Sequence, residues 1–514
     1  MKAKLFWHKY KYFKYERDFA IREVESKLNK PSITNNKDFI EVEGNFKIND
    51  LQDLVYFAKF EYKKKINSTL QYYLENSTNN SKKINGKQST RYSVHGLHEY
   101  KGKFNPQIVR SLLNIFNKNK RALILDPFCG SGTTLIECLF GGYNSIGFDL
   151  NPLAIYITKA KYLSLTYDIE LIRDFGKKLF KNWLKNLKTK NPIKEPTNPR
   201  SEYLQKWFPE QYFKEIESLY FSIKELTRNH NKSRIGKNIS MIFLIIGSNL
   251  LREYSNQEPA DLRIRKRRTP FPKESYFHKY KVSYENYIKK IENYNNDCFI
   301  RKSTTLNAPI CDVSNKDNLE NIFKEEKIID CIITSPPYAT ALPYIDTQRL
   351  SLVWLQLLSP KEIKIIEEEL IGSREYIYKN NIMWNERLIN NSRRLPTEIY
   401  NFCLDLKNSI GNDDGFRRQA IPSLLYRYFS KMKISFENLF PYLKEDSNFL
   451  LIVGKNHTTL NGNKRVIDTP LLLANLAEKI GWKCLEISPL ETYKRYDLHS
   501  KNSIKYESLI VLKK

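Results

Sequence analysis

Two features are scarce in this sequence of 514 residues: paired cysteines and long apolar runs. The seven cysteines are scattered and none forms a Cys-x-x-Cys pair, so the sequence indicates neither a zinc site nor a disulfide framework. The longest apolar run, Met241–Ile246, is far too short to span a bilayer. The N-terminus, MKAKLFWHKYKYFKY, has no apolar core of signal-peptide length. We therefore expect a cytoplasmic protein with no metal and no membrane partner.

Acidic residues are also in deficit, since 57 acidic residues stand against 85 basic ones and give a formal charge of +28. Such an excess favours polyanionic partners through phosphate neutralisation and counterion release. A composition rich in Lys, Asn and Ile is also what an AT-rich genome encodes, so charge alone does not establish a nucleic-acid partner. At roughly 100–200 residues per domain, the length predicts two to four domains.

One stretch combines two strands, a glycine loop, a helix and an acid. It comprises an apolar run, a glycine-punctuated turn, a helix-like segment and a second apolar run: 122–125, 126–132, 133–140 and 145–148. This order predicts a nucleotide-type ligand on the carboxyl ends of adjacent parallel strands. Gly130 and Gly132 permit a sharp turn close to the ligand, and Asp149 can accept hydrogen bonds from a ribose diol.

The loop lacks the features of a phosphate binder, because no Lys-Ser/Thr follows it and Asp126 brings negative charge. An acid at this position suits a cationic or zwitterionic ligand. The run DPFCGSGTT followed by GFDLNP resembles the cofactor-binding motifs of amino-group DNA methyltransferases. The resemblance implies S-adenosylmethionine, whose sulfur is cationic. It also implies a Rossmann-like α/β fold, a mostly parallel, doubly wound sheet with an antiparallel edge strand.

The same resemblance extends to flanking segments. KGKFNPQIV is similar to the family segment that closes over the methionine end of the cofactor. Asp312 is placed like the contact to the adenine amino group, although it could instead cap a helix over Asn318–Phe323. Phe104 taken alone suits a core position better, and His98 could be a ligand, a base or a structural residue. The resemblance implies these cofactor contacts: Lys103, Phe104, Asp126, Phe128, Gly130, Gly132, Thr133, Asp149, Leu150 and Asp312.

A second motif follows an apolar segment, Ile328–Thr334, of the kind found in buried parallel strands. An exocyclic base amine is a poor nucleophile, so an enzyme must accept hydrogen bonds from its protons. The Ser335 hydroxyl and the Pro336 carbonyl can do so, while the two prolines fix φ and remove amide donors. A base flipped out of the duplex could stack on the ring of Tyr338. The predicted catalytic residues are Ser335, Pro336, Pro337 and Tyr338, and the alternative is a structural diproline turn.

In the family that the sequence resembles, Ser in the first position is typical of cytosine-N4 enzymes, and Asp or Asn of adenine-N6 enzymes. The resemblance thus implies site-specific methylation of double-stranded DNA, with cytosine N4 favoured and adenine N6 as the alternative. A cognate restriction endonuclease of a restriction-modification system is a possible partner. Two other hypotheses stay open: an RNA exocyclic-amine methyltransferase, and a non-enzymatic nucleic-acid-binding protein with a degenerate core.

The composition divides the chain into four segments. Residues 1–90 form an accessory segment with a possible helix over Ile48–Leu74, and 91–164 begin the methyltransferase domain. We expect residues 165–300 to form a mostly helical insertion, which is a possible DNA-recognition region. Residues 301–514 form the catalytic part, in which the polar, irregular 371–430 could also contact DNA. The basic run RIRKRR predicts DNA contacts at Arg263, Arg265, Lys266, Arg267 and Arg268.

Overall fold

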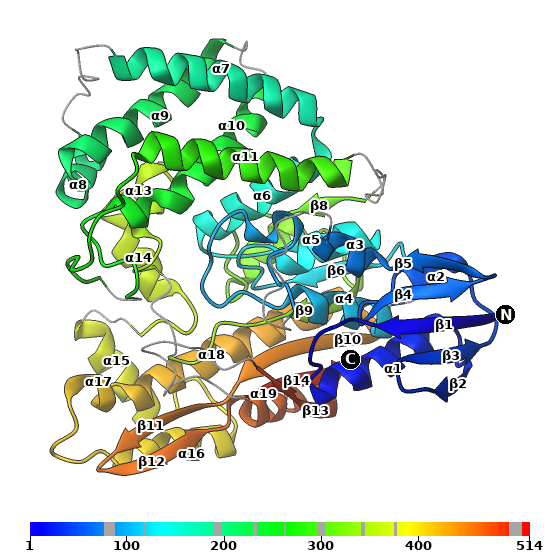
Figure 1. The fold of residues 1–514 in the computed structure, drawn as a ribbon. Coiled ribbons are helices and arrows are strands. Elements are labelled where there is room, and N and C mark those ends of the chain that lie inside the picture. Colours follow the sequence, from blue (N-terminus) through cyan, green and yellow to red (C-terminus); the bar gives the residue numbers. More distant parts are fainter. Residues whose placement is uncertain are drawn as a thin grey trace.

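The computed structural model describes residues 1–76, 88–117, 119–188, 198–229, 234–261, 264–295, 304–340, 345–374, 378–492 and 506–514. Most of the linker expected over 76–89 lies outside these residues, as does Arg263. A seven-stranded sheet in the order β13-β14-β10-β9-β6-β7-β8 forms the centre (Figure 1). Within the described part, no helix has the length and apolar character needed to cross a membrane.

Five strands of the central sheet run parallel: β6 (Leu123–Asp126), β7 (Asn144–Gly147), β8 (Leu306–Asn307), β9 (Ile329–Thr334) and β10 (Leu443–Gly454). At one side, β14 (Tyr506–Lys513) is antiparallel to β10 and to the edge strand β13 (Lys483–Glu491). The predicted Rossmann-like, mostly parallel sheet with antiparallel pairing at one edge is confirmed. The reversed strand itself is second from that edge.

The strand order reverses direction next to β6. The chain passes from β6 to β7 and β8 on one side, and then returns to place β9 on the other side. Ile124 pairs with Cys331 and Leu125 with Ile332, so the two strands are neighbours despite the long insertion between them. Such a switch point is where ligands bind in open α/β sheets, outside the carboxyl ends of the strands.

Strand residues are buried on both faces of the sheet. Leu125, Ile332 and Leu451 face a core covered by helices, whereas Ile124 and Leu450 face a second core on the other side. The first face is covered by α12 (Lys316–Ile322), α16 (Thr397–Asn408), α18 (Ile421–Leu439) and α19 (Thr469–Glu478). The second is covered by α4 (Pro106–Phe116), α5 (Thr133–Gly141) and the N-terminal unit. This two-sided burial explains why the strands read as continuous apolar runs.

The N-terminal unit is an antiparallel sheet in the order β2-β3-β1-β4-β5, flanked by three helices. Its elements are β1 (Lys2–Trp7), α1 (Lys14–Lys27), β2 (Ser32–Asn35), β3 (Phe39–Glu43), α2 (Ile48–Gln52), β4 (Phe57–Tyr62), β5 (Lys65–Ser68) and α3 (Leu70–Asn76). The helix expected over Ile48–Leu74 is wrong, because β4 and β5 pair as a hairpin inside that range. The core of this unit is continuous with that of the central sheet, so it is packed as an integral part of the fold.

Residues 165–300 are mostly helical, as predicted. The helices of this upper lobe stack above the sheet in Figure 1: α6 (Pro152–Thr166), α7 (Ile169–Lys188), α8 (Pro199–Trp207), α9 (Glu210–Asn229), α10 (Arg234–Leu250) and α11 (Tyr276–Asn295). The first of these helices, α6, continues without a break to Thr166. That helix is buried almost all round, which leaves no polar face to mark its length in the sequence.

A lower lobe projects from the catalytic half of the chain (Figure 1). It contains α15 (Tyr378–Ile389), α16, α17 (Phe416–Gln419) and the hairpin β11 (Asn456–Leu460) and β12 (Asn463–Ile467), whereas α13 (Arg349–Trp354) and α14 (Glu362–Glu369) pack against the core of the upper lobe. The irregular structure expected over 371–418 is therefore wrong. Trp384, Leu388, Ile399 and Cys403 are buried in the core beneath these helices, and this packing stabilises segments that are polar on average.

Candidate active site

The glycine loop after β6 is tightly packed. Gly130 and Gly132 have φ values of +49° and +75°, which side chains other than glycine rarely adopt. A Cβ on Gly132 would lie 2.5 Å from the Thr158 hydroxyl oxygen, and one on Gly130 would lie 3.1 Å from the Tyr100 ring. The loop therefore requires glycine at both positions, as the motif predicts.

Two acids flank this loop at the ends of neighbouring strands. Asp126 is 3% exposed, and its Oδ1 accepts hydrogen bonds from the Thr334 hydroxyl at 2.6 Å and from the Phe128 amide at 3.2 Å. Asp149 accepts hydrogen bonds from the amides of Gly130 at 2.9 Å and Asn151 at 2.8 Å. Burial raises the pKa of each carboxyl to about 6. Carboxylate oxygens have further lone pairs with which to accept from a ligand.

Asp312 lies next to Asp149 on the following strand position. Asp149 bridges to Ile310, and the Cys311 amide donates to the Asp149 carbonyl at 3.2 Å. The alternative role of Asp312 as a helix cap is wrong, because Asn315 caps α12 by accepting from the Asp317 amide at 3.0 Å. Asp312 accepts instead from the amide and hydroxyl of Ser314.

The serine–diproline loop begins beside the glycine loop. Thr334, the last residue of β9, donates the 2.6 Å hydrogen bond to Asp126 that joins the two motifs. Ser335 is half-buried, and its hydroxyl has no hydrogen-bond partner among the described residues. Tyr338 donates from its hydroxyl to Glu507 while its ring packs against the sheet core. An oxygen acceptor is therefore available at the start of the loop.

Three residues that the sequence analysis missed hold the serine–diproline loop. Gly372 has φ +79°, and a Cβ there would lie 2.7 Å from the Tyr338 carbonyl oxygen. Arg374 donates to the Thr340 carbonyl, and the Asn456 side chain donates to the Ala339 carbonyl at 2.8 Å. A single glycine, arginine or asparagine in a polar stretch carries no local signal, so only the tertiary structure identifies these contacts.

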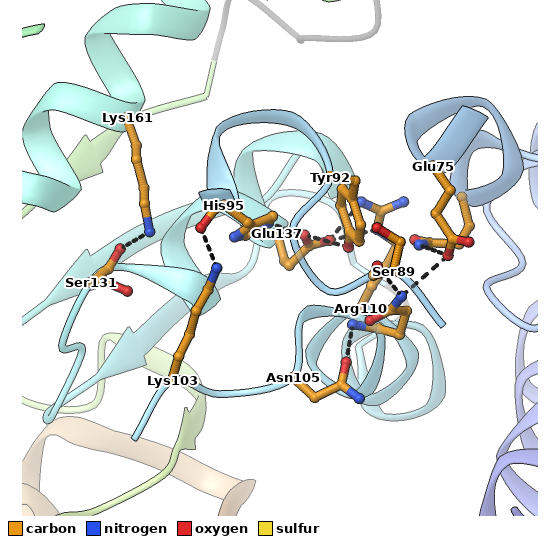
Figure 2. Close-up of polar contacts among 12 residues, drawn as sticks. Glu75, Ser89, Tyr92, His95, Lys103, Asn105, Arg110, Ser131, Glu137 and Lys161 are labelled. Carbon is orange, nitrogen blue, oxygen red and sulfur yellow. Dashed lines mark hydrogen bonds and ion pairs between the residues drawn. The ribbon is translucent and has the colours of Figure 1, made fainter. Parts of the chain in front are cut away.

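A buried polar cluster lies behind the glycine loop, centred on Glu137 of α5 (Figure 2). Glu137 accepts from the Tyr92 hydroxyl at 2.9 Å and from Arg110 Nε at 2.7 Å, and contacts His95 Nε2 at 2.6 Å. Burial disfavours the charge, but Arg110 and the hydrogen bonds outweigh it and hold the pKa of Glu137 below its usual value. The cluster ties the segment that carries Lys103 to the first helix after the glycine loop.

Two lysines converge from opposite sides of this region (Figure 2). Lys103 donates to the His95 carbonyl, and Lys161 of α6 donates to the Ser131 carbonyl in the glycine loop at 2.6 Å. Among the described residues, neither lysine forms an ion pair with an acid. Burial lowers the pKa of Lys103 to about 7 and that of Lys161 well below its ordinary value. Lys161 was not predicted, although it follows Thr158 on the helix face that contacts the loop.

Other predicted positions are mainly packing residues. Phe104 packs against the N-terminal core and Phe128 against the core on the opposite face, whereas Thr133 begins α5 and is buried. Leu150 follows Asp149 and is half-buried. His98 is structural, because its ring contacts the Glu99 carbonyl at 2.8 Å and Ser248 Oγ at 3.2 Å, and burial lowers its pKa to about 4.

The basic run after α10 contains one inward-facing arginine. Arg267 donates to the carbonyls of Glu253, Ser255, Thr269 and Pro270, and its guanidinium lies 4.3 Å from the Phe271 ring centroid. This gives Arg267 a structural role in holding the turn. Arg265, Lys266 and Arg268 are exposed, although Arg265 pairs with Asp261 at 2.8 Å. These three exposed residues retain the predicted DNA contact as a hypothesis.

Thiol and metal chemistry find no support in the described residues. No group of three or more His, Cys, Asp or Glu side chains is arranged there to hold a metal. The Cys129 thiol in the glycine loop is buried, and burial together with Asp149 and Asp126 raises its pKa well above the ordinary value. It is therefore a packing residue rather than a nucleophilic thiolate.

The open α/β sheet, with acids after adjacent strands and a serine–diproline loop at the switch point, agrees with the fold that the resemblance to methyltransferases implies. Residues 4–160 match a family model described as DNA methylase. The Type II methyltransferase M.BsoBI of Geobacillus stearothermophilus is 24% identical over 82% of this chain and 84% of that one. The Type II methyltransferase M.AvaI of Nostoc sp. is 26% identical over 77% of this chain and 80% of that one. By these matches the chain is similar to DNA methylases over residues 4–160 and to Type II methyltransferases over most of its length.

Two further matches carry less weight, one because of its short extent and the other because of its low similarity. The Type II methyltransferase M.MjaII of Methanocaldococcus jannaschii is 36% identical, but the match spans 26% of this chain and 25% of that relative. Among solved structures, the rRNA methyltransferase aviRa from Streptomyces viridochromogenes covers 81% of this chain and 88% of its own. Its identity is 10% and its TM-score 0.27, so this likeness adds nothing to the sheet order described above.

Proposed function

We propose that this protein is a site-specific DNA methyltransferase that uses S-adenosylmethionine to methylate the exocyclic amine of a flipped base, most favourably cytosine N4. The observation that carries the proposal is the 2.6 Å hydrogen bond from Thr334 to Asp126. It places the start of the serine–diproline loop against the acid of the glycine loop. The groups that hold a methyl donor and those that hold an amine therefore lie at the carboxyl ends of the neighbouring strands β6 and β9.

The donor set fits S-adenosylmethionine. Asp126 suits a cationic part of that molecule, Asp149 a ribose diol and Asp312 an adenine amino group, since all three are hydrogen-bond acceptors. Lys103 and Lys161 supply two buried amino groups without acidic partners, and a carboxylate such as that of the methionine part would favour their charged form. When bound, this cofactor supplies an electrophilic methyl group.

The chain itself orients and activates the base. The Ser335 hydroxyl, unpartnered among the described residues, accepts a hydrogen bond from the target amine, and the Pro336 carbonyl accepts a second. Drawing both protons away from the ring plane makes the nitrogen lone pair available. The Tyr338 ring, anchored through Glu507, offers a stacking face. Flipping the base costs a few kcal/mol, and positioning in a partly buried site supplies most of the rate.

Several finer points belong to this proposal. Ser335 rather than Asp or Asn favours cytosine N4, with adenine N6 as the alternative. The relatives are named Type II methyltransferases, which supports a cognate restriction endonuclease as partner and an intracellular site of action on the host DNA. The exposed residues of the basic run and of the lower lobe are the candidate DNA contacts.

The test is methyl transfer from labelled S-adenosylmethionine to duplex DNA and, in parallel, to total RNA. We expect label in duplex DNA only, and sequencing of DNA from expressing cells should place N4-methylcytosine at one short sequence. N6-methyladenine at that site would establish the alternative base. Label in RNA alone, or a folded protein without affinity for the cofactor, would contradict the proposal.

A further inference from the structure

The tip of the lower lobe carries an exposed aromatic ring. Phe416, the first residue of α17, is 78% exposed, the largest fraction for any large hydrophobic side chain among the described residues. Single exposed hydrophobic residues are common on protein surfaces, so exposure alone carries no functional meaning. Three further features of this tip do: its rigidity, its position relative to the serine–diproline loop, and its charge.

Phe416 follows a turn, residues 411–415, that hydrogen bonds hold in place, and we call this turn the mount. Asp414 is 5% exposed, and its Oδ2 accepts from the Gly411 amide at 2.9 Å and from the Asn461 amide at 2.8 Å. The Gln419 side chain donates to the Asp414 carbonyl at 2.7 Å. These bonds fix the turn before α17 to the end of the β11–β12 hairpin. The exposed ring is therefore held outward by a built structure.

The hairpin connects this mount to the serine–diproline loop. At its base, Asn456 donates to the Ala339 carbonyl at 2.8 Å, and at its tip Asn461 donates to Asp414. The five residues of β11 between them span about 17 Å at roughly 3.4 Å per residue. Figure 1 shows α17, β11 and β12 together at the end of β10. If the hairpin lies along the duplex axis, the mount lies about five base pairs from the loop, because DNA rises about 3.4 Å per base pair.

Positive charge flanks the ring. Arg417 is exposed, with its guanidinium 5.6 Å from the Phe416 ring centroid, and Arg418 is exposed at the next position, where its guanidinium also pairs with Asp414 at 3.6 Å. Lys464 on β12 is exposed on the hairpin that supports them. A ring with cations on one side matches the arrangement of bases and phosphates in a duplex. Apolar wedges of this kind are used by proteins that press against or between base steps.

We propose that Phe416 packs against the bases of the DNA duplex about half a helical turn from the target base, while Arg417 and Arg418 bind the adjoining phosphates. The inference rests on the proposed function, since it takes duplex DNA as the substrate. It assigns to α17 the role of an anchor that fixes the register of the duplex relative to the serine–diproline loop.

The first experiment is photocrosslinking with p-benzoylphenylalanine in place of Phe416 in the full chain, on a duplex that contains the methylated sequence. We expect crosslinks to nucleotides about five base pairs from the modified base. The control carries the same group at Ile66, which is 65% exposed on β5 of the N-terminal unit, and should give none. An active enzyme that crosslinks equally from both positions, or from neither, would overturn the proposal.

The second experiment compares binding constants for the same duplex. Phe416→Ala should weaken binding about tenfold and leave the salt dependence unchanged, because the ring contributes no charge. The double variant R417Q/R418Q should lower the slope of log K against log salt by about 1.8, at roughly 0.9 per phosphate contact. Ile66→Ala should match the wild type. Unchanged duplex binding in both α17 variants would refute the proposed role of α17. A wild-type protein that does not bind duplex DNA would refute the proposed function itself.

Discussion

The Glu137 cluster and the serine–diproline loop are both polar and both border the glycine loop, yet their hydrogen bonding differs. Around Glu137, the acid is matched by a tyrosine, a histidine and an arginine within the same buried cluster. At the loop, the Ser335 hydroxyl has no partner in the described part of the chain, and Lys161 has only a backbone carbonyl. The matched Glu137 carboxylate holds the fold, although His95 Nδ1 and Arg110 Nη1 in its cluster have no hydrogen-bond partner among the described residues. The Ser335 hydroxyl, by contrast, is available to a ligand.

The largest effect should come from breaking the Glu137 cluster. Glu137→Ala leaves Arg110 buried without its carboxylate, which typically costs about 3–5 kcal/mol. Chemical denaturation should therefore show a large loss in the free energy of unfolding. Glu320→Ala removes an exposed ion pair with Lys316 and should leave stability almost unchanged. Equal stability of the two variants would show that the Glu137 cluster does not hold the fold.

Ser335→Ala should lower the activity and leave the stability unchanged. The hydroxyl contributes no hydrogen bond to the fold, so the unfolding midpoint should match that of the wild type. Loss of an acceptor needed only as the amine reacts should lower kcat by about 10²–10³-fold, by analogy with the loss of one oxyanion-hole donor. Full activity in this variant would favour the hypothesis of a structural diproline turn.

Lys161→Met tests whether an unpartnered ammonium binds the cofactor carboxylate. Loss of one charge-assisted hydrogen bond of about 1.4 kcal/mol corresponds to tenfold weaker binding of S-adenosylmethionine. Binding of decarboxylated S-adenosylmethionine, measured by calorimetry, should not change. Lys159→Met, an exposed neighbour on α6, serves as the control. If Lys161 only supports the Ser131 carbonyl, both ligands should lose affinity by the same factor.

The basic run offers the same contrast between neighbouring arginines. Arg267→Gln should destabilise the fold by about 1–3 kcal/mol, because buried or partly buried carbonyls lose their donor. Arg268→Gln should leave the unfolding midpoint unchanged and, if the residue binds a phosphate, lower the salt slope of duplex binding by about 0.9. A lower salt slope for Arg267→Gln would reverse these assignments.

The smallest effect concerns pH. The pKa values of Asp126 and Asp149 are raised to about 6, above the usual value of the unfolded chain. Since the folded state holds these protons more tightly, these two groups contribute less stability as pH rises through the window from about 4 to 6. Cofactor binding needs the carboxylates, so affinity should rise severalfold over the same window. Flat binding from pH 5 to 7 would show that neither carboxyl contacts the cofactor.

The sequence predicted the sheet and its motifs because each has a local signature. Apolar runs end at Asp126, Asp149 and Thr334, and glycine is needed at two positions with positive φ. It could not predict the residues that act through tertiary contacts, such as Asn456 and Lys161. It also failed where packing overrides composition, as in the helices of 371–418 and the β4–β5 hairpin, whose stability comes from partners distant in sequence.

The pairing of β7 with β8 has a consequence for how this protein can vary. The upper lobe is a closed excursion between two strands that already lie side by side. The entropic cost of such a closure grows slowly, by about 0.6 kcal/mol for each doubling of its length. A lobe of different size or shape can therefore be exchanged at this point at little thermodynamic cost, while the strand ends that carry the glycine and serine–diproline loops stay in place.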